Sequence, residues 1–487
     1  MATIAENISQ AINDFGNIKT AIINKGVDVP NDTPTANYPE YIQNIETGGS
    51  GGFVINGSVE TLKAADNIAV GDFVSISGTE TEYESVNSTI NTGQSFHAVM
   101  LNNTRMFVIQ SFSTTIQVCA SVYDFVSDSW LLINTIILSS TSQTGIYLYA
   151  VKLSENKVVV AYTTTTNSRL CGRVCSIETD GTITAGAQTN ISTDNLSAAY
   201  MPCMVALSES TAVIFSATAS ANRQLCAYVL TINGISMTVG TIMYIDSVKY
   251  SGEYKAAIAL SESKILVVYC LTKSSNNLLA RIFSVEGSVL TLGQLYTIDE
   301  SVMLYNVATV GYSKKCMVLE LLNATTVVLV GALNTYSTNS NNVGAVVLTL
   351  EEGVIISDAY TLLDRNGYSP LAMSAIKTAN GFFSIYRTNT VGSNKTRYIE
   401  CKIKQDKSIQ VEDRGLLGAE DIGAYYDLNI FRADDKLIIA HSTTTSSNYF
   451  SILMRDDVSI IKKLSGTIKG IAKTAAGVGE PIKVYVP

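Results

Sequence analysis

One motif returns along most of this chain at a nearly constant interval. Its clearest copy is ALSESKILVVY at residues 259–269, and close relatives occupy residues 151–162 and 205–216. The anchor position, a leucine in the best copies, recurs at Leu101, Leu153, Leu207, Leu260, Leu322, Ile376 and Phe431. The steps between anchors are 52, 54, 53, 62, 54 and 55 residues. A period near 50 with several short strands per copy is typical of radial β-repeats, in which each copy forms one blade.

A single copy of the repeat predicts four strands. In the copy around Leu260, we expect strands at residues 255–260, 265–271, 278–285 and 290–298. The second is a continuous apolar run, as expected for a strand covered on both faces. The fourth alternates through Leu290, Leu292, Gln294 and Tyr296. This alternation indicates an outer strand with one face in water.

Two other β architectures fit the repeat less well. A β-sandwich would not keep this period seven times. A β-helix repeats at a much shorter interval. We therefore predict a mainly β protein built around a seven-bladed β-propeller, with six or eight blades as the alternatives.

Composition limits the partners and the compartment. Only 15% of the residues are charged, the net charge is −9 and no basic run is present, so we expect no nucleic-acid binding. No run of 18 apolar residues exists, so we expect no membrane span. The opening residues MATIAENISQ lack the basic and apolar regions of a signal peptide. We expect a protein made in a cytoplasm and not secreted.

Residues that could bind a metal are sparse. Eight cysteines are scattered at positions 119, 171, 175, 203, 226, 270, 316 and 401, mostly in different predicted strands. We expect them to be buried free thiols. Cys171 and Cys175, the one close pair, have no histidine nearby, so we expect neither a metal nor another cofactor.

Residues that usually carry catalysis are equally rare. His97 and His441 are the only histidines, each in an apolar strand-like context, and we expect core or rim positions for both. The nearest approach to a sialidase box, SIETDGTIT at residues 176–184, lacks a tryptophan and does not repeat. We therefore predict that the protein is not an enzyme. A glycan-cleaving enzyme that uses carboxylates near the propeller axis is the less favoured alternative.

Residues 3–25 predict an amphipathic helix. Thr3 and Glu6 can form a capping box, and Gly26 closes the helix. Apolar residues follow heptad spacing at Ile4, Ile8, Ala11, Phe15, Ile18 and Ile22. This seam predicts a homo-oligomer with a coiled coil, and a trimer because no buried polar residue enforces a dimer. A helix packed on its own domain is the alternative.

The segment after this helix resembles a known group of proteins. Residues 25–45, KGVDVPNDTPTANYPEYIQNI, are similar to the N-terminal segment of tail-associated proteins of phages that infect Gram-positive bacteria. In that group a Lys-Gly-Val-x-Val-Pro turn precedes a Tyr-x-x-x-Ile helix, which falls here at residues 38–45. The resemblance covers less than a tenth of the chain. It implies a virion structural protein that assembles with other virion proteins.

The two ends of the chain resemble a small β-module common in phage structural proteins. A Gly-Asp-x-Val strand lies at residues 71–74, and a hairpin around a Gly-rich turn lies at residues 464–487. The resemblance implies that residues 55–82 and 464–487 form one discontinuous module, with the β-propeller inserted at residues 83–463. Residues 1–47 are then a helical anchor, and the Gly/Ser-rich residues 48–54 are a flexible linker.

Polar loops mark one face of the expected propeller. The connections between second and third strands are rich in Ser, Thr and Asn in copies two to seven. The connections that lead into the first strands carry tyrosines at positions 147, 200, 254, 312, 368 and 425. Equivalent loops emerge on the same face of a propeller, so we expect these groups to gather there. Solvated loops, with the tyrosines filling wedges between blades, are the alternative.

This face is the predicted ligand-binding surface. Sugar rings stack on aromatic side chains and their hydroxyls pair with Ser, Thr and Asn, so a bacterial cell-surface glycan is the favoured ligand. The candidate contacts are Tyr254, Tyr368, Asn276, Arg387 and Tyr449. We predict a tail-associated virion protein that displays its propeller for host recognition by receptor or glycan binding. A purely architectural role as a collar, baseplate or capsid decoration is the alternative.

Overall fold

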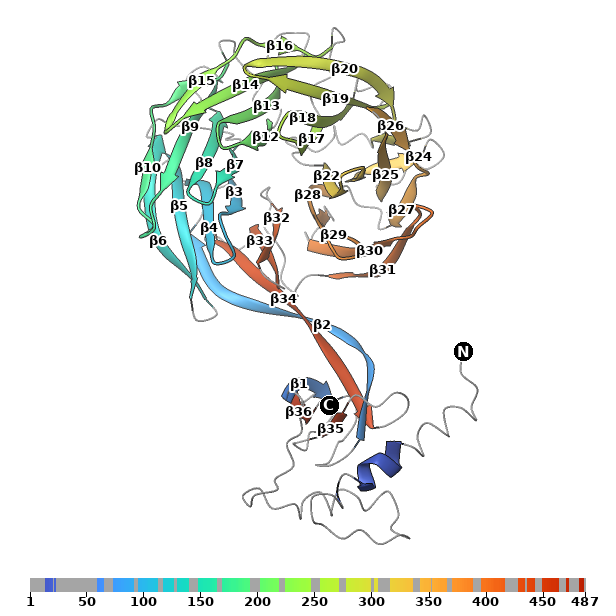
Figure 1. The fold of residues 1–487 in the computed structure, drawn as a ribbon. Coiled ribbons are helices and arrows are strands. Elements are labelled where there is room, and N and C mark those ends of the chain that lie inside the picture. Colours follow the sequence, from blue (N-terminus) through green and yellow to red (C-terminus); the bar gives the residue numbers. More distant parts are fainter. Residues whose placement is uncertain are drawn as a thin grey trace. The chain divides into compact units, whose positions relative to one another are not determined.

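The computed structural model divides the chain into two compact units (Figure 1). The terminal unit comprises Met1–Glu82 and Asp456–Pro487, and the ring unit is Tyr83–Arg455. The structure describes residues 14–20, 22, 59–64, 73–91, 95–112, 117–126, 129–139, 148–163, 169–192, 202–218, 224–246, 255–270, 277–298, 302–304, 316–335, 342–351, 353–365, 370–388, 396–416, 428–433, 436–442, 449–463, 470–472 and 481–485. Most of these residues lie in strands.

The described part of the ring unit contains six antiparallel sheets of four or five strands each. The first three are β3 (Ser95–Met100), β4 (Arg105–Phe112), β5 (Gln117–Val126) and β6 (Ser129–Ser139); β7 (Leu148–Ser154), β8 (Lys157–Thr163), β9 (Leu170–Ile177), β10 (Ile183–Ala185) and β11 (Thr189–Asn190); and β12 (Cys203–Ser208), β13 (Thr211–Ala217), β14 (Leu225–Asn233), β15 (Ser236–Val239) and β16 (Met243–Tyr244).

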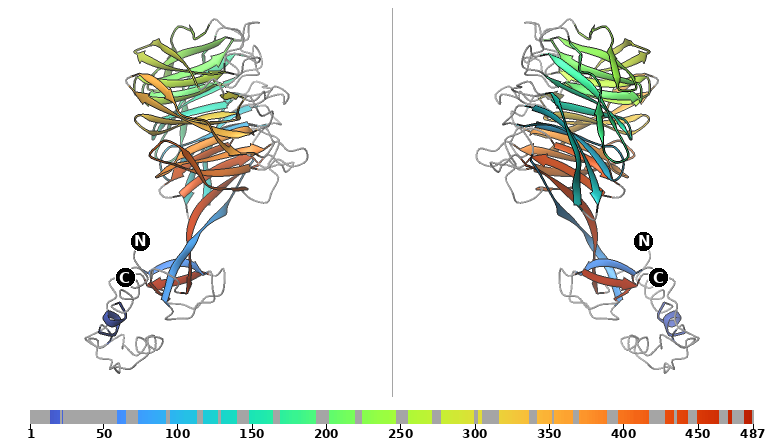
Figure 2. Two further views of the ribbon diagram at one scale, coloured as in Figure 1. Left: turned by 90° about the vertical axis from the view of Figure 1, so that its right-hand side faces the viewer. Right: turned by 90° about the vertical axis from the view of Figure 1, so that its left-hand side faces the viewer.

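The other three sheets continue in chain order. They are β17 (Lys255–Ser261), β18 (Lys264–Cys270), β19 (Leu278–Glu286) and β20 (Val289–Thr297); β22 (Met317–Asn323), β23 (Thr326–Gly331), β25 (Val343–Glu351), β26 (Val354–Ser357) and β27 (Thr361–Asp364); and β28 (Pro370–Lys377), β29 (Gly381–Thr388), β30 (Thr396–Ile403) and β31 (Ile409–Leu416). In addition, β21 (Val302–Leu304) pairs with β24 (Leu333–Thr335). Figure 1 shows the sheets placed one after another around a central axis, and Figure 2 shows the same sheets from two sides.

A larger sheet takes strands from both ends of the chain. β32 (Leu428–Ala433), β33 (Lys436–Ser442) and β34 (Tyr449–Lys463) continue into β2 (Phe73–Asn91), β35 (Gly470–Ala472), β36 (Pro481–Tyr485) and β1 (Val59–Ala64). β2 and β34 each extend from one unit into the other. β1 pairs with β36 on one side and with β34 on the other. The pairings β1-β36-β35-β2-β34-β1 therefore form a closed circuit.

Seven apolar clusters hold the sheets of the ring unit together, and each cluster contains buried residues from two sheets. Six of them connect sheets that follow each other in the chain; one, for example, contains Phe107 of β4 and Val160 of β8. The seventh contains Phe96 of β3 and Ile438 of β33, so the last sheet packs against the first. The sheets thus close around the axis. The prediction of a mainly β protein with a β-propeller is confirmed.

The repeat predicts the inner part of each blade well. The observed strands β17, β18, β19 and β20 begin and end within two residues of the four strands expected around Leu260. β18 is buried at every position after Lys264, because neighbouring sheets cover both of its faces. This confirms the predicted continuous apolar second strand.

The predicted alternation of the fourth strand is wrong beyond its start. Leu290 in β20 is buried, with 4% of its surface exposed, but Leu292 is 38% exposed. Leu292 is exposed although it keeps the regular register with Phe283, because β20 is the outermost strand of its sheet. Beyond Leu292 the register shifts between Arg281 and Phe283, which leaves an extra residue on β20 next to Gly293. A Cβ on Gly293 would lie 2.2 Å from the carbonyl oxygen of Ile282. Such a β-bulge inverts the faces of the residues that follow it.

The anchor leucines mark a recurrent irregularity at the end of the first strand. In β7, β12, β17 and β22 the register with the second strand shifts at the anchor, as between Lys152 and Ser154. The next residue then caps the turn: Asn323 Oδ1 accepts the N–H of Thr325 at 2.9 Å. Short polar side chains favour such turns. The repeated Leu-Ser or Leu-Asn pair therefore encodes a bulge followed by a tight turn.

Residues 14–20 and 22 are helical, within the range expected for the N-terminal helix. Among the six seam residues, Phe15 and Ile18 are half-buried and Ile22 is fully buried within the chain. Ile4, Ile8 and Ala11 lie outside the described residues, as do the second expected helix and the linker. Over the described residues, no helix has the length and apolar character needed to cross a membrane.

Candidate functional site

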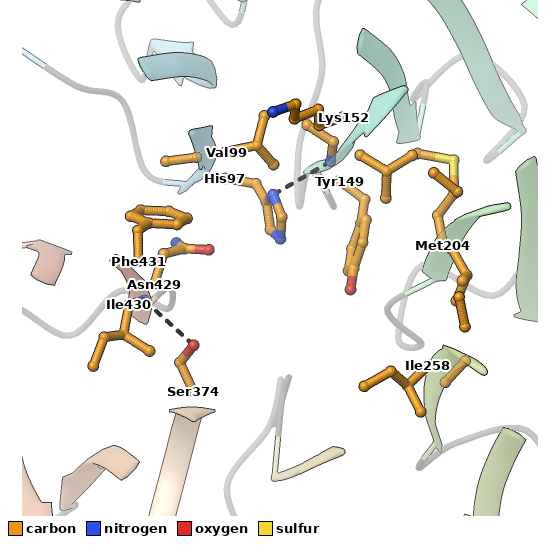
Figure 3. Close-up of a pocket in the computed structure, with 17 residues that line it drawn as sticks. His97, Val99, Tyr149, Lys152, Met204, Ile258, Ser374, Asn429, Ile430 and Phe431 are labelled. Atoms are coloured by element: carbon orange, nitrogen blue, oxygen red, sulfur yellow. Dashed lines mark hydrogen bonds between the residues drawn. The ribbon is translucent and has the colours of Figure 1, made fainter. Parts of the chain in front are cut away.

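A cavity of about 370 Å³ lies inside the ring unit (Figure 3). Its walls come from the first strands of six sheets: β3, β7, β12, β17, β28 and β32. Because a first strand is the one nearest the axis in each sheet (Figure 1), the cavity is axial. We call it the axial cavity. Its volume lies at the low end of the range for small-molecule sites, about 300 to 1,000 Å³.

Equivalent positions of the seven first strands can be found from the hairpin register. Each pairs with the fifth residue of its second strand, as His97 does with Ile109 and Asn429 with Ala440. The seven equivalent residues are His97, Tyr149, Cys203, Ala256, Val318, Ser374 and Asn429. We call these residues the axial layer.

The axial layer is chemically divided. Its four polar members, Ser374, Asn429, His97 and Tyr149, come from four sheets that follow one another around the ring, and all four line the axial cavity. We call them the polar arc. The three other members are apolar or a thiol and do not line it. Polar groups are therefore concentrated on one side of the axis.

Backbone groups of the next sheet orient two residues of the polar arc. The N–H of Ala150 donates to Nδ1 of His97 at 3.3 Å, and the His97 and Tyr149 rings stack with centroids 4.3 Å apart. The N–H of Ile430 donates to Oγ of Ser374 at 3.4 Å. An imidazole nitrogen that accepts a hydrogen bond carries no proton, so neutral His97 has its proton on Nε2. His97 is thus held as a donor through Nε2.

Asn429 occupies the corresponding position in β32. Only 4% of its surface is exposed, and its Nδ2 has no hydrogen-bond partner among the described residues. A buried amide group without a partner costs about 1–3 kcal/mol. Figure 3 shows this side chain at the edge of the cavity, between Phe431 and His97. Among the described residues, this buried amide therefore has no hydrogen bond that would offset the cost of its burial.

The other side of the cavity is apolar. Met204 of β12 and Ile258 of β17 project there (Figure 3), together with Ala257. The one lysine of the lining, Lys152, donates from Nζ to the carbonyl oxygen of Leu101. No Asp or Glu is present among the described residues that line the cavity. The site can therefore offer hydrogen bonds from one side and apolar contact from the other, with little charge.

Other polar side chains are engaged in contacts between sheets. Tyr269 donates to Asp246 at 2.6 Å, and Arg281 donates from Nε to the Tyr269 hydroxyl at 3.3 Å. Burial raises the pKa of Tyr269, and the carboxylate that accepts its hydrogen bond raises the pKa further. The same arrangement joins Tyr386 and Asp364 to an arginine of β30. These carboxylates are structural, and no cluster able to hold a metal occurs in the described parts of the chain.

The structure describes few of the residues predicted to contact a ligand. Tyr254, Tyr368 and Asn276 lie outside the described residues. Tyr449 is the first residue of β34, where only the backbone is described. Arg387 lies in β29 and is only 2% exposed. The axial cavity brings none of these five residues together.

Sequence reasoning missed the polar arc because it considered His97 alone. The signal is present in the repeat: in five copies the axial layer lies four residues before the anchor, and in the last two it lies two residues before it. A comparison of the residues at this position across the seven copies would have separated the polar from the apolar members of the axial layer. The spacing differs because the last two anchors, Ile376 and Phe431, pair with the third residue of the second strand and so lie two residues nearer the axial layer than the anchor leucines of the other copies.

Comparisons with known proteins add little to this picture. No protein-family model and no curated protein sequence matches the chain. A similar fold occurs in AofleA from Arthrobotrys oligospora, with a TM-score of 0.42 and 10% identity over 73% of this chain and 96% of that one. Another occurs in the WD40 domain of SCAP from fission yeast, with a TM-score of 0.42 and 9% identity over 77% of this chain and 98% of that one. The periplasmic gluconolactonase PpgL of Pseudomonas aeruginosa is also similar, with a TM-score of 0.42 and 10% sequence identity, over 76% of this chain and 95% of that one. Likeness at this level carries no argument about function.

Proposed function

We propose that this chain is a tail-associated virion protein of a phage of Gram-positive bacteria and that its β-propeller binds the host surface. The observation that carries the proposal is the course of the chain. The ring unit is inserted into a terminal unit whose strand circuit draws on both ends of the sequence. Such an insertion leaves the terminal unit for attachment to other virion proteins and the ring unit for recognition. The resemblance of residues 25–45 to phage tail-associated proteins supports the virion assignment.

We propose a propeller of seven blades. Six sheets supply six blades, and β32, β33 and β34 supply the seventh with β2 as outer neighbour of β34. The seven apolar clusters, each between two sheets, support this count. The seventh blade would then combine strands from before and after the ring in sequence. Closure of this kind ties the two chain ends together.

A surface glycan is the favoured ligand. The axial cavity offers hydroxyl, amide and imidazole groups opposite apolar side chains, and glycans present hydroxyls together with apolar ring faces. Cleavage of a glycosidic bond usually needs two carboxyl groups, and the described lining has none. Binding without cleavage is therefore the proposal. Tyr254, Tyr368, Asn276 and Tyr449 remain proposed contacts on the loop face, and buried Arg387 would support its loop.

The test is adhesion of the labelled full-length protein to a panel of Gram-positive bacteria. We expect binding to a subset of strains and loss of that binding after mild periodate oxidation of the cells, which destroys vicinal diols of surface sugars. Cells treated with protease instead of periodate are the control and should still bind. Adhesion that survives periodate and disappears with protease would reject the glycan. Absence of adhesion to every strain would reject the host-surface role.

An architectural virion role is the second candidate, and one surface favours it. β6, the outermost strand of its sheet, exposes four large aliphatic side chains: Leu131 at 48%, Leu132 at 55%, Ile133 at 41% and Ile137 at 57%. Apolar groups gathered on one outer strand are typical of a protein-binding surface. If this role is correct, Leu132→Lys combined with Ile137→Lys should prevent incorporation into particles while leaving cell adhesion of the free protein unchanged.

A further inference from the structure

We infer that the axial cavity binds a single neutral monosaccharide unit, which the polar arc of Ser374, Asn429, His97 and Tyr149 recognises. The inference rests on the proposed function, because it names the group on the host glycan that the propeller would bind. It differs from the loop-face contacts predicted from sequence in both location and residues.

The hydrogen-bonding capacity of the polar arc suits a polyol. The proton of neutral His97 lies on Nε2, since Nδ1 accepts the N–H of Ala150. The side-chain amide of Asn429 contains both donor and acceptor atoms. The Ser374 hydroxyl accepts from Ile430 and keeps its own proton to donate. Sugar hydroxyls both donate and accept, so adjacent hydroxyls can satisfy such a mixed set.

The buried amide of Asn429 points to a ligand in this place. Its Nδ2 is buried and has no partner among the described residues, although the equivalent residues His97 and Ser374 each accept a backbone N–H from the next sheet. The position therefore departs from the pattern of its own layer. A hydroxyl oxygen that accepts from Nδ2 would recover the desolvation cost of the amide, and removal of that amide should therefore weaken binding.

The apolar wall and the charge balance narrow the ligand class. Met204 and Ile258 face the polar arc across the cavity (Figure 3), and with Ala257, which also lines it, they suit the C–H face of a pyranose ring. The described residues of the lining include no carboxylate, and Lys152 already donates to a backbone carbonyl. A cationic ligand would lack a counter-charge there. The volume of about 370 Å³ favours one sugar unit over a longer chain.

The experiment measures binding of simple sugars to the full-length protein by saturation-transfer NMR. The probes are free glucose, galactose, rhamnose and N-acetylglucosamine, with the corresponding uronic acids as a charged arm. Single-site binding of free sugars is expected near the millimolar range. The variants are Asn429→Leu, which removes the amide at similar volume, and Ala257→Leu, which fills the cavity from the apolar side. Val318→Thr is the matched control, because Val318 belongs to the axial layer but does not line the cavity.

We expect at least one neutral sugar to bind, and both cavity variants to bind it at least about tenfold more weakly. The Val318→Thr protein should bind as the wild type does. Thermal unfolding of each variant separates lost binding from lost folding, and Ala257→Leu provides a second route if Asn429→Leu does not fold. Sugar binding that both folded cavity variants retain would overturn the inference, as would preference for the uronic acids.

The outcome is distinguishable from failure of the proposed function. If wild-type protein adheres to cells in a periodate-sensitive manner while the cavity variants adhere equally well, glycan binding stands and the cavity is not its site. If free sugars bind in the cavity but no cell surface is bound, the cavity serves a soluble sugar and the adhesion role fails. If the wild-type protein binds neither free sugars nor cells, both the inference and the proposed function are rejected.

Discussion

At the residue scale, buried polar groups tie neighbouring sheets together. Asp364, at the end of β27 and 4% exposed, accepts hydrogen bonds from Tyr386 and Arg397 of the next sheet. Arg397 also donates a hydrogen bond from Nε to the hydroxyl oxygen of Tyr386 at 3.1 Å. All three groups have lost most of their contact with water, so each depends on the others. The stability of this junction should therefore respond sharply to loss of a single member.

Asp364→Ala tests this dependence. The change leaves the Tyr386 hydroxyl and the Arg397 guanidinium without their shared acceptor, and we expect the free energy of unfolding to fall by about 2–3 kcal/mol. Urea denaturation measures it. Asp180→Ala is the control, because Asp180 is exposed and accepts the N–H of Thr182 in a local turn; it should change stability little. Equal effects of the two substitutions would show that the junction contributes nothing specific.

The buried thiols predict how stability depends on alkaline pH. Burial raises the pKa of Cys175, Cys316 and Cys401 from 9.0 to about 12. Above pH 9 the thiols ionise in the unfolded chain but not in the folded one, so the unfolded chain binds fewer protons and its free energy falls relative to that of the folded chain. Stability should therefore be full below pH 9 and fall between pH 9 and about 12. Thermal unfolding across this window checks the prediction, and a flat profile would contradict it.

At the element scale, the repeat in the sequence predicted the buried strands, but it did not predict the bulges and hydrogen bonds that depend on local backbone geometry. The apolar runs after Lys157 and Lys264 identified buried second strands, because coverage on both faces leaves no other choice. The bulge at Gly293 was not predictable from alternation alone, since it depends on a close approach to the Ile282 carbonyl. The polar arc was missed because the hydrogen-bonding state of His97 is set by a backbone group of another sheet.

The bulge itself should be sensitive to a single methyl group. In Gly293→Ala the new Cβ would lie 2.2 Å from a backbone oxygen, so β20 has to shift. We expect a loss of about 1–3 kcal/mol in the free energy of unfolding. Thr291→Ala, two residues earlier in the same strand and exposed, is the control and should be nearly neutral. If both variants unfold at the same urea concentration, the bulge does not require glycine.

The N-terminal helix carries the prediction of a trimer. Phe15 and Ile18 are the described seam residues that keep exposed surface. Changing both to aspartate would place charges in a packed apolar seam, so the full-length protein should pass from trimer to monomer. Light scattering after size exclusion gives the mass. Gly16→Ala is the control, because a Cβ at that position meets no atom within 4 Å. A wild-type protein that is already monomeric would reject the seam.

At the scale of the whole molecule, the two ends of the chain meet in one strand circuit. The sequence placed a propeller between residues 83 and 463, whereas the compact units divide after Glu82 and after Arg455. The second division falls inside β34, because this strand serves both units. A sequence pattern records that residues form a strand, but it does not record where one strand passes between two units. The length of β2 and β34 was therefore beyond prediction.

The central claim is that the propeller is displayed on a virion for recognition of the host. A cryo-electron microscopy map of the intact particle, with this chain located in it, tests the claim most directly. We expect the terminal unit to contact other virion proteins and the mouth of the axial cavity to open to solvent. A map in which other virion proteins cover the propeller and its axial cavity, or in which the chain is absent from the particle, would contradict it.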